Sequence, residues 1–152
     1  MALYLVQHGK SLPKDVDPEC SLSKEGVSEV KLIAGVAENY HVKVQKIFHS
    51  GKKRASQTAA LLYDILKPPQ EVAEMPGLGP MDDVDAVVPK LDVDANVMLV
   101  GHLPFMERLV SRLTTGRAEH TIFKFQNGGI VCLDQEEGGS WHIKWALMPK
   151  IG

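Results

Sequence analysis

Apolar positions along this chain form short continuous runs that alternate with longer segments in which apolar residues recur every three or four positions. The short runs, bounded by turn-forming residues, are typical of buried strands, and the longer spacing is typical of helices with one buried face. The predicted strands cover residues 2–6, 46–48, 71–75, 97–100, 129–133 and 141–147, and the predicted helices cover 24–39, 54–66, 82–91 and 104–113. This alternation predicts an α/β fold.

Capping and turn residues set the expected element boundaries. Ser23 is placed to cap the first helix, Pro89 interrupts the helix over 82–91, and Pro104 suits the first turn of the last helix, where its missing N–H costs nothing. The turn-rich residues 136–139 suggest an antiparallel hairpin at one edge of the sheet. We therefore expect a single three-layer α/β/α domain over residues 1–152, with a mostly parallel sheet, helices on both faces and an antiparallel edge.

Composition and charge narrow the class of protein. The chain has 152 residues, of which 44% are hydrophobic and 24% charged, as in an ordinary globular protein. A net charge of -2 argues against a nucleic-acid partner bound by phosphate neutralisation. No apolar stretch is long enough to span a bilayer, Met1 is followed by no basic leader segment, and Cys20 and Cys132 lack metal-type spacing. These features predict a cytoplasmic protein without a membrane partner.

Three of the predicted strands end in polar loops, over residues 7–10, 49–54 and 101–102. Ligands of open parallel sheets bind beyond the carboxyl ends of the strands, so His8 and His102 are expected at one site. An imidazole can attack phosphorus, and an arginine fork such as that of Arg54 matches phosphoryl oxygens. This combination predicts a site that binds and transfers phosphate.

The same residues resemble the motifs of the histidine phosphatase superfamily. Residues 7–9 read Gln-His-Gly where the family has Arg-His-Gly, and residues 50–58 resemble its Ser-Pro-x-x-Arg-Ala-x-x-Thr. Residues 101–102 match its late Gly-His, and residues 22–26 match its Leu-Ser/Thr-x-x-Gly. Each motif alone is weak, but their order, spacing and the chain length resemble the small SixA-type phosphohistidine phosphatase branch over essentially the whole chain.

This resemblance implies a phosphoglycerate mutase-like fold and a two-step transfer in which His8 is the nucleophile and a phosphohistidine intermediate is then hydrolysed. It implies a phosphorylated protein or a small phosphorylated compound as substrate, with no cofactor and no metal. His102 would help most as a cation. The phosphate-binding residues implied are Gln7, Gly9, Ser50, Arg54 and His102.

The acid that protonates the leaving group is not fixed by the motifs. Larger members of the family supply a carboxylate, and Asp82 and Asp83 follow the loop over residues 77–80. Asp83 is the candidate acid, although both side chains could instead cap or solvate the next helix. An imidazole or anhydride leaving group departs more readily than an alkoxide and needs less acid assistance.

Gln7 stands where the family has an arginine, which leaves two alternatives open. A charged hydrogen bond is worth roughly 1.5 to 3 kcal/mol against about 1 for a neutral one, so up to about 30-fold in rate could be lost. The protein could therefore be a phosphate-binding regulatory module with weak or no turnover. A second alternative is a zinc hydrolase that uses His8, His49 and His102 as ligands.

Overall fold

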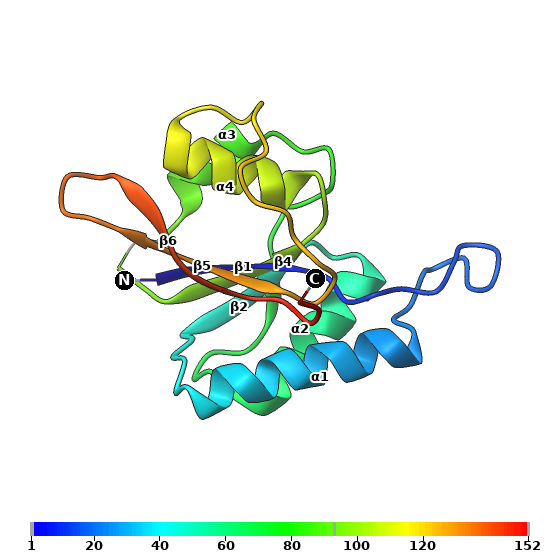
Figure 1. The fold of residues 1–152 in the computed structure, drawn as a ribbon. Helices are drawn as coiled ribbons and strands as arrows, with labels where there is room; N and C mark the ends of the chain where they lie inside the picture. Colours follow the sequence, from blue (N-terminus) through cyan, green and yellow to red (C-terminus); the bar gives the residue numbers. More distant parts are fainter. Residues whose placement is uncertain (1, 93, 152) are drawn as a thin grey trace.

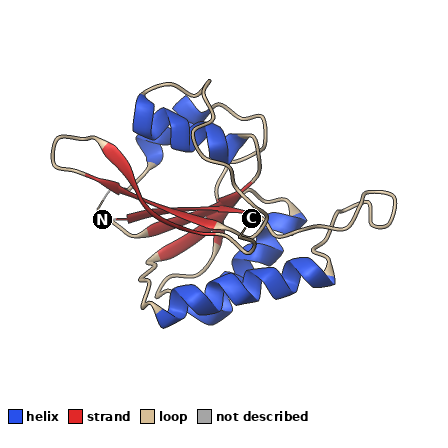
Figure 2. Ribbon diagram, in the orientation of Figure 1, coloured by secondary structure: helices blue, strands red, loops and turns tan. Residues whose placement is uncertain are grey.

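The computed structural model describes residues 2–92 and 94–151, and these contain a six-stranded sheet with strand order β3-β2-β4-β1-β5-β6 (Figures 1 and 2). The pairs β1/β4, β2/β4 and β2/β3 are parallel, whereas β1/β5 and β5/β6 are antiparallel. The predicted mostly parallel sheet with an antiparallel edge is thus confirmed. The strands are β1 (Ala2–Gln7), β2 (Lys46–His49), β3 (Ala73–Glu74), β4 (Val97–Gly101), β5 (Ile130–Gln135) and β6 (Trp141–Leu147).

Helices cover both faces of the sheet, which gives the predicted three layers (Figure 1). The chain moves outward from β1 through β2 to β3 and then returns to place β4 between β1 and β2. Because strand crossovers keep one hand, this change of direction puts the earlier and later helices on opposite faces. One face carries α1 (Lys24–Asn39) and α2 (Lys53–Leu66), and the other carries α3 (Val84–Val87), the 3-10 helix Val88–Lys90 and α4 (Phe105–Thr115).

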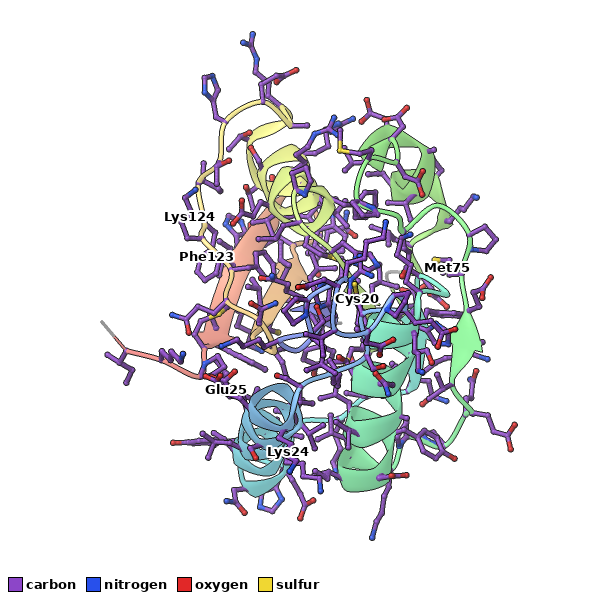
Figure 3. The ribbon with its side chains drawn as sticks, turned by 90° about the vertical axis from the view of Figure 1, so that its right-hand side faces the viewer. Cys20, Lys24, Glu25, Met75, Phe123 and Lys124 are labelled. Atoms are coloured by element: carbon purple, nitrogen blue, oxygen red, sulfur yellow. The ribbon has the colours of Figure 1, made fainter. Side chains whose placement is uncertain are left out.

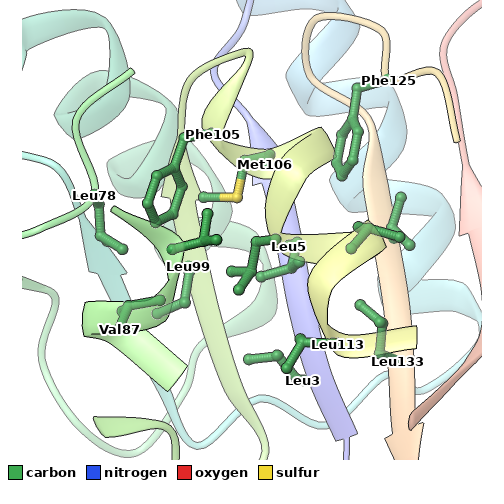
Figure 4. Close-up of a cluster of buried hydrophobic side chains, with 14 of the residues drawn as sticks. Leu3, Leu5, Leu78, Val87, Leu99, Phe105, Met106, Leu113, Phe125 and Leu133 are labelled. Atoms are coloured by element: carbon green, nitrogen blue, oxygen red, sulfur yellow. The ribbon is translucent and has the colours of Figure 1, made fainter. Parts of the chain in front are cut away.

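Two hydrophobic cores follow from this layering. Side chains of a strand alternate between the faces, so Leu5 of β1 packs on the α4 side while Val6 packs on the α1 and α2 side. Figure 4 shows the core on the α4 side, in which Phe105 and Met106 lie over Leu5 and Leu99. All of these side chains are fully buried. The central strands are therefore rigid supports for whatever follows their carboxyl ends.

The central strands β1 and β4 are neighbours, and the chain leaves them toward opposite faces. Such a switch point opens a crevice beyond the strand ends, where ligands bind in open α/β sheets. Gln7 and Gly101 are paired at the last position of the two strands. His8 and His102 come directly after them.

Some element boundaries differ from the sequence prediction. The strand expected over 71–75 is paired only at Ala73 and Glu74, because it lies at the edge of the sheet and joins β2 alone. The helix expected over 82–91 divides into α3 and a 3-10 turn, in agreement with the interruption expected at Pro89. Pro104 is the N-cap of α4 rather than a residue of its first turn. None of the helices described is long and apolar enough to span a membrane.

Candidate active site

The two strand-end histidines lie side by side. The backbone N–H of His8 donates to the carbonyl oxygen of Gly101 at 2.9 Å, which ties the end of β1 to the end of β4. The imidazole rings of His8 and His102 have their centroids 5.0 Å apart and are inclined by 53°. The switch point of the sheet therefore brings both imidazoles to one site.

The hydrogen bonding of His8 determines which of its ring nitrogens is free. Its Nδ1 lies 2.7 Å from the carbonyl oxygen of Gly9, and because a carbonyl only accepts, Nδ1 carries the proton. Burial lowers the pKa of His8, and the Arg54 cation lowers it further, although the Gly9 hydrogen bond opposes both effects. His8 is thus neutral with an available lone pair on Nε2, as a nucleophile requires.

Arg54 is the second residue of α2, and it acts on both imidazoles. The half-buried Arg54 cation lowers the pKa of His8 and of His102. It sits in the first turn of a 14-residue helix, where unpaired backbone N–H groups and the helix dipole also favour an anion. The expected imidazole pair with a guanidinium beside it is therefore present.

His102 is deeply buried, and its surroundings disfavour the charged form of its ring. Its ring is 1% exposed, and its Nε2 lies 2.6 Å from the hydroxyl oxygen of Ser50. Burial lowers its pKa from 6.5 to about 3, with further lowering by His8, Arg54 and Lys52. The cationic form in which His102 would help most is therefore disfavoured, because the ring is buried and the Arg54 and Lys52 cations oppose a further positive charge.

The depressed pKa of His102 predicts a dependence of stability on pH. Its pKa in the folded protein lies below the ordinary value of 6.5, so its contribution is complete above pH 6.5 and is lost as the pH falls toward 3. Between pH 6.5 and about pH 5, this histidine should remove about 2 kcal/mol from the free energy of unfolding. Urea denaturation of wild type and His102→Gln measures the difference. Equal pH slopes for the two proteins would contradict the buried neutral state.

Gln7 lies at the last position of β1 and is 8% exposed. Its side-chain oxygen Oε1 is buried and has no hydrogen-bond partner among the residues described, and the same is true of Nδ1 of His102. Nearly all buried polar atoms in proteins are hydrogen-bonded. These two atoms at adjacent strand ends are therefore left for a ligand.

Thr58 connects the nucleophile loop to the arginine helix, a role that the sequence analysis did not assign. Its side chain is fully buried, and Oγ1 accepts from the backbone N–H of Gly9 at 2.9 Å. The same hydroxyl donates to the backbone carbonyl of Arg54 at 2.7 Å. The threonine that ends the Arg-Ala-x-x-Thr motif was the available signal. Its position, four residues after Arg54, is where a helical hydroxyl reaches back to that carbonyl.

Two glycines let the loop after β1 pack against α1. A Cβ on Gly9 would lie 2.8 Å from Cγ2 of Val30, and a Cβ on Gly26 would collide with the carbonyl oxygen of Lys10. That carbonyl accepts from the backbone N–H of Ser23 at 2.9 Å and from its hydroxyl at 3.0 Å, while Ser23 caps α1. The residues of the Leu-Ser-x-x-Gly motif thus fix the loop that carries His8.

The turn before β5 holds the backbone of the nucleophile from the other side. The amide nitrogen Nδ2 of Asn127 donates to the carbonyl oxygen of His8 at 3.2 Å. The backbone N–H of Gly128 donates to the carbonyl oxygens of Gln7 and His8, and its φ of +79° is one that glycine adopts readily. This Asn-Gly turn therefore fixes the position of the His8 backbone.

The expected acid, Asp83, has a structural partner. It is the N-cap of α3 and accepts from the backbone N–H of Asp85 at 2.9 Å, while Asp82 accepts from that of Gly79 at 2.7 Å. Neither carboxylate is among the charged groups that shift the pKa of His8 or His102. Asp83 thus caps α3 and Asp82 stabilises the loop before it, so these contacts do not support Asp83 as the acid.

Nearby lysines differ in what they offer the site. Lys10 forms an ion pair with Glu25 at 2.6 Å, and Lys53 forms one with Glu19 at 2.8 Å. Lys52, in contrast, acts electrostatically on His102. Figure 3 faces this end of the sheet and shows Glu25 at the start of α1, below the loop that joins β1 to α1.

The third histidine of the zinc alternative has other partners. Nδ1 of His49 accepts from the backbone N–H of Gly51 at 3.0 Å, and Glu74 is the charged group that acts on its pKa. Within residues 2–92 and 94–151, no cluster of three or more His, Cys, Asp or Glu side chains has the arrangement of a metal site. The three-imidazole arrangement is not favoured.

Comparisons with known proteins agree with this geometry. No family model matches the chain. The phosphohistidine phosphatase SixA of Escherichia coli K12 is 27% identical over 155 residues, which cover 98% of this chain and 94% of that protein. A structure of the protein histidine phosphatase SixA with tungstate superposes with a TM-score of 0.86 at 27% identity, over 98% of this chain and 97% of the other. The alpha-ribazole phosphatase of Shigella flexneri shares the fold, with a TM-score of 0.78 at 17% identity over 100% and 98% of the two chains.

The fold is phosphoglycerate mutase-like, and the paired strand-end histidines beside Arg54 make the chain similar to proteins of the histidine phosphatase superfamily. Within that superfamily, its homologues by both sequence and structure are SixA phosphohistidine phosphatases.

Proposed function

We propose that this protein is a phosphatase that removes a phosphoryl group from phosphohistidine in a protein, or from a small phosphorylated compound, through a covalent intermediate on His8. The observation that carries this proposal is the neutral His8 ring, with Nδ1 committed to Gly9 and Nε2 free, next to Arg54 and His102. Similarity to SixA over the whole chain supports the same substrate class.

The proposed reaction has two displacements. The Nε2 lone pair of His8 forms a bond to phosphorus, and the bond from phosphorus to the leaving atom breaks with its electron pair on that atom. Water then attacks phosphorus, the bond to Nε2 breaks with its electron pair returned to the ring, and the water proton is released with inorganic phosphate. The chemistry needs no metal or cofactor.

The remaining residues of the site hold the phosphoryl group. The Arg54 fork can take two phosphoryl oxygens, and the start of α2 adds backbone N–H groups. Ser50 orients His102 through its hydrogen bond to Nε2. We infer that Gln7, Gly9, Ser50, Arg54 and His102 bind phosphate, mainly by positioning it and by stabilising charge in a loose transition state.

The second candidate function is a phosphate-binding module with weak or no turnover. Gln7 favours it, because a neutral amide occupies the position at which the family carries a guanidinium. A site with one arginine and a neutral His102 attracts a phosphoryl dianion less strongly than a site with two arginines. Binding without turnover would leave His8 as a ligand contact rather than a nucleophile.

A direct assay separates these functions. Chelator-treated protein should release phosphate from a phosphohistidine peptide, and faster than from an aryl phosphate, because an imidazole leaving group needs little acid assistance. If the protein binds inorganic phosphate but releases no phosphate from either substrate, it is a phosphate-binding module. Activity that is lost with chelator and restored by zinc would instead support the metal hydrolase.

The setting follows from the same features. We propose that residues 1–152 act as one domain in the cytoplasm. Cys20 and Cys132 are both free thiols, which suits a reducing compartment.

A further inference from the structure

Two buried polar atoms at the site have no partner in the part of the chain described, namely Oε1 of Gln7 and Nδ1 of His102. Both side chains are more than nine-tenths buried, with exposures of 8% and 1%. A buried polar atom without a hydrogen bond is costly, so proteins seldom retain one unless a ligand completes it. Their positions at the predicted phosphoryl site identify that ligand group as a phosphoryl group.

The backbone places the two atoms at neighbouring strand ends. Gln7 is the ladder partner of Gly101, and His102 is the next residue. A Cβ on Gly101 would lie 2.6 Å from Cε of Met106 and 3.3 Å from the carbonyl oxygen of Leu78. The end of β4 is therefore closely packed against these two residues. A group bound beyond these two strand ends can therefore contact both atoms.

The two atoms need different hydrogen-bond partners. An amide oxygen only accepts, so Oε1 of Gln7 needs a donor. In neutral His102, a Ser50 hydroxyl that donates to Nε2 leaves the ring proton on Nδ1, which then needs an acceptor. A fully ionised phosphoryl group has only hydrogen-bond acceptors, so one of its oxygens would face Oε1 of Gln7 without a hydrogen between them. A phosphoryl group that retains one proton offers both.

We propose that Gln7 makes this site selective for the monoanionic, singly protonated form of its phosphoryl ligand. The inference rests on the proposed function, because it takes the phosphoryl group as the ligand. It makes Gln7 a specificity-determining residue, and not merely a weaker phosphate ligand than the arginine of the family.

The charges around the site agree with a single negative charge on the ligand. Burial, with smaller contributions from His8, Arg54 and Lys52, lowers the pKa of His102 to about 3, so the ring adds no charge of its own. His8 is neutral for the same reasons. Next to Ser50, His49 of β2 is acted on by Glu74 of β3, and these two groups bear opposite charges when both are ionised.

A monoanionic substrate also carries the proton that the leaving group needs. As His8 attacks and the bond to the leaving atom breaks, the proton of the P–OH group moves to that atom. The products are a neutral leaving group and a dianionic phosphoryl group on Nε2. This transfer suits a site in which neither Asp82 nor Asp83 acts on the two imidazoles, whereas the Arg54 cation acts on both.

Binding of inorganic phosphate and sulfate tests the selectivity without turnover. Sulfate has the same shape as phosphate but carries no proton near neutral pH. Any change in its affinity with pH therefore comes from titration of the protein alone. Wild-type affinity for phosphate, measured by calorimetry, should fall about tenfold for each pH unit above the second pKa of phosphate, relative to sulfate. On the acid side of that pKa, phosphate should bind at least about tenfold more tightly than sulfate. Equal affinities for the two ions, as expected if Gln7 turned its NH₂ group toward the oxygens, would overturn the proposal.

Three variants locate the effect at Gln7. Gln7→Arg should bind sulfate about tenfold or more tightly than wild type does and should lose the pH dependence, whereas Gln7→Met, of similar size, should lose selectivity without gaining sulfate affinity. Gln135→Arg adds the same charge at the opposite end of the sheet, next to Asp134, which pairs with Ala2 at the start of β1, and this variant should behave as wild type. An unchanged ratio of phosphate to sulfate affinity in Gln7→Met would also overturn the proposal. Selective binding without turnover would refute the proposed function alone, and turnover without selectivity would refute only the role of Gln7.

Discussion

Replacing His8 with alanine is expected to reduce turnover of a phosphohistidine peptide by about 10⁴-fold or more while leaving phosphate binding within a few-fold of wild type. The large loss follows because Nε2 of His8 forms the bond to phosphorus, and the neighbouring His102 has its own Nε2 paired with Ser50. Binding persists because Arg54, Ser50 and His102 come from other elements, α2 and the loops after β2 and β4.

Rapid-quench experiments with a labelled phosphoryl donor measure the intermediate directly. Wild type should accumulate an acid-labile, base-stable adduct on His8, and His8→Ala should form none. The control is His142→Ala, because His142 is exposed on β6 and its ring nitrogen Nε2 lies 3.3 Å from Glu136. His49→Ala tests the zinc alternative and should keep most of the activity. Undiminished turnover by His8→Ala would refute the covalent mechanism.

Much of the fold could be predicted from the sequence because the elements are strongly patterned. The continuous apolar run of β4 is buried on both faces, and Ser23 caps α1 at the position where its hydroxyl can accept from the backbone N–H of Gly26. The ends of the elements are less clearly marked in the sequence. The pairing of β3 is limited to two residues by its place at the edge of the sheet, and that placement is a tertiary property absent from the local pattern.

The site could be predicted only to the level of which residues meet. Strand endings indicated that His8 and His102 would share a crevice, and their rings are 5.0 Å apart. Protonation could not be predicted, because the lowered pKa of His102 comes from burial beneath loops distant in sequence. The hydrogen bonds from Gly9 through Thr58 to the carbonyl of Arg54 could not be predicted either, since Gly9 and Thr58 are 49 positions apart in the sequence.

This connection also explains why the nucleophile and its phosphate clamp act as a unit. The backbone N–H of Gly9, the hydroxyl of Thr58 and the carbonyl of Arg54 form one chain of hydrogen bonds from the loop after β1 to the first turn of α2. The Gly9 carbonyl in turn fixes the ring of His8. A shift of α2 would therefore move both the guanidinium and the attacking nitrogen.

Arg54→Ala is the second substitution with a large expected effect, a loss in kcat/KM of about 10³-fold. The fork supplies charge and two donors to the transferring phosphoryl group, and these contacts strengthen as charge develops in the transition state. The hydrogen bond from Thr58 ends on the backbone carbonyl of Arg54, so the substitution keeps the chain to Gly9 and His8. The loss should therefore come from the clamp and not from a displaced nucleophile.

Arg54→Lys separates charge from geometry, because an ammonium restores the positive charge but not the planar fork. Its kcat/KM should lie between those of wild type and Arg54→Ala, about 10- to 100-fold below wild type. The matched control is Arg112→Ala on α4, whose guanidinium pairs with Asp85 at 2.6 Å on the opposite face of the sheet. Steady-state kinetics with a phosphohistidine peptide, together with thermal unfolding of each variant, provide the measurement. A kcat/KM of Arg54→Ala within a few-fold of wild type would remove Arg54 from the site, because no other guanidinium acts on the two imidazoles within the described chain.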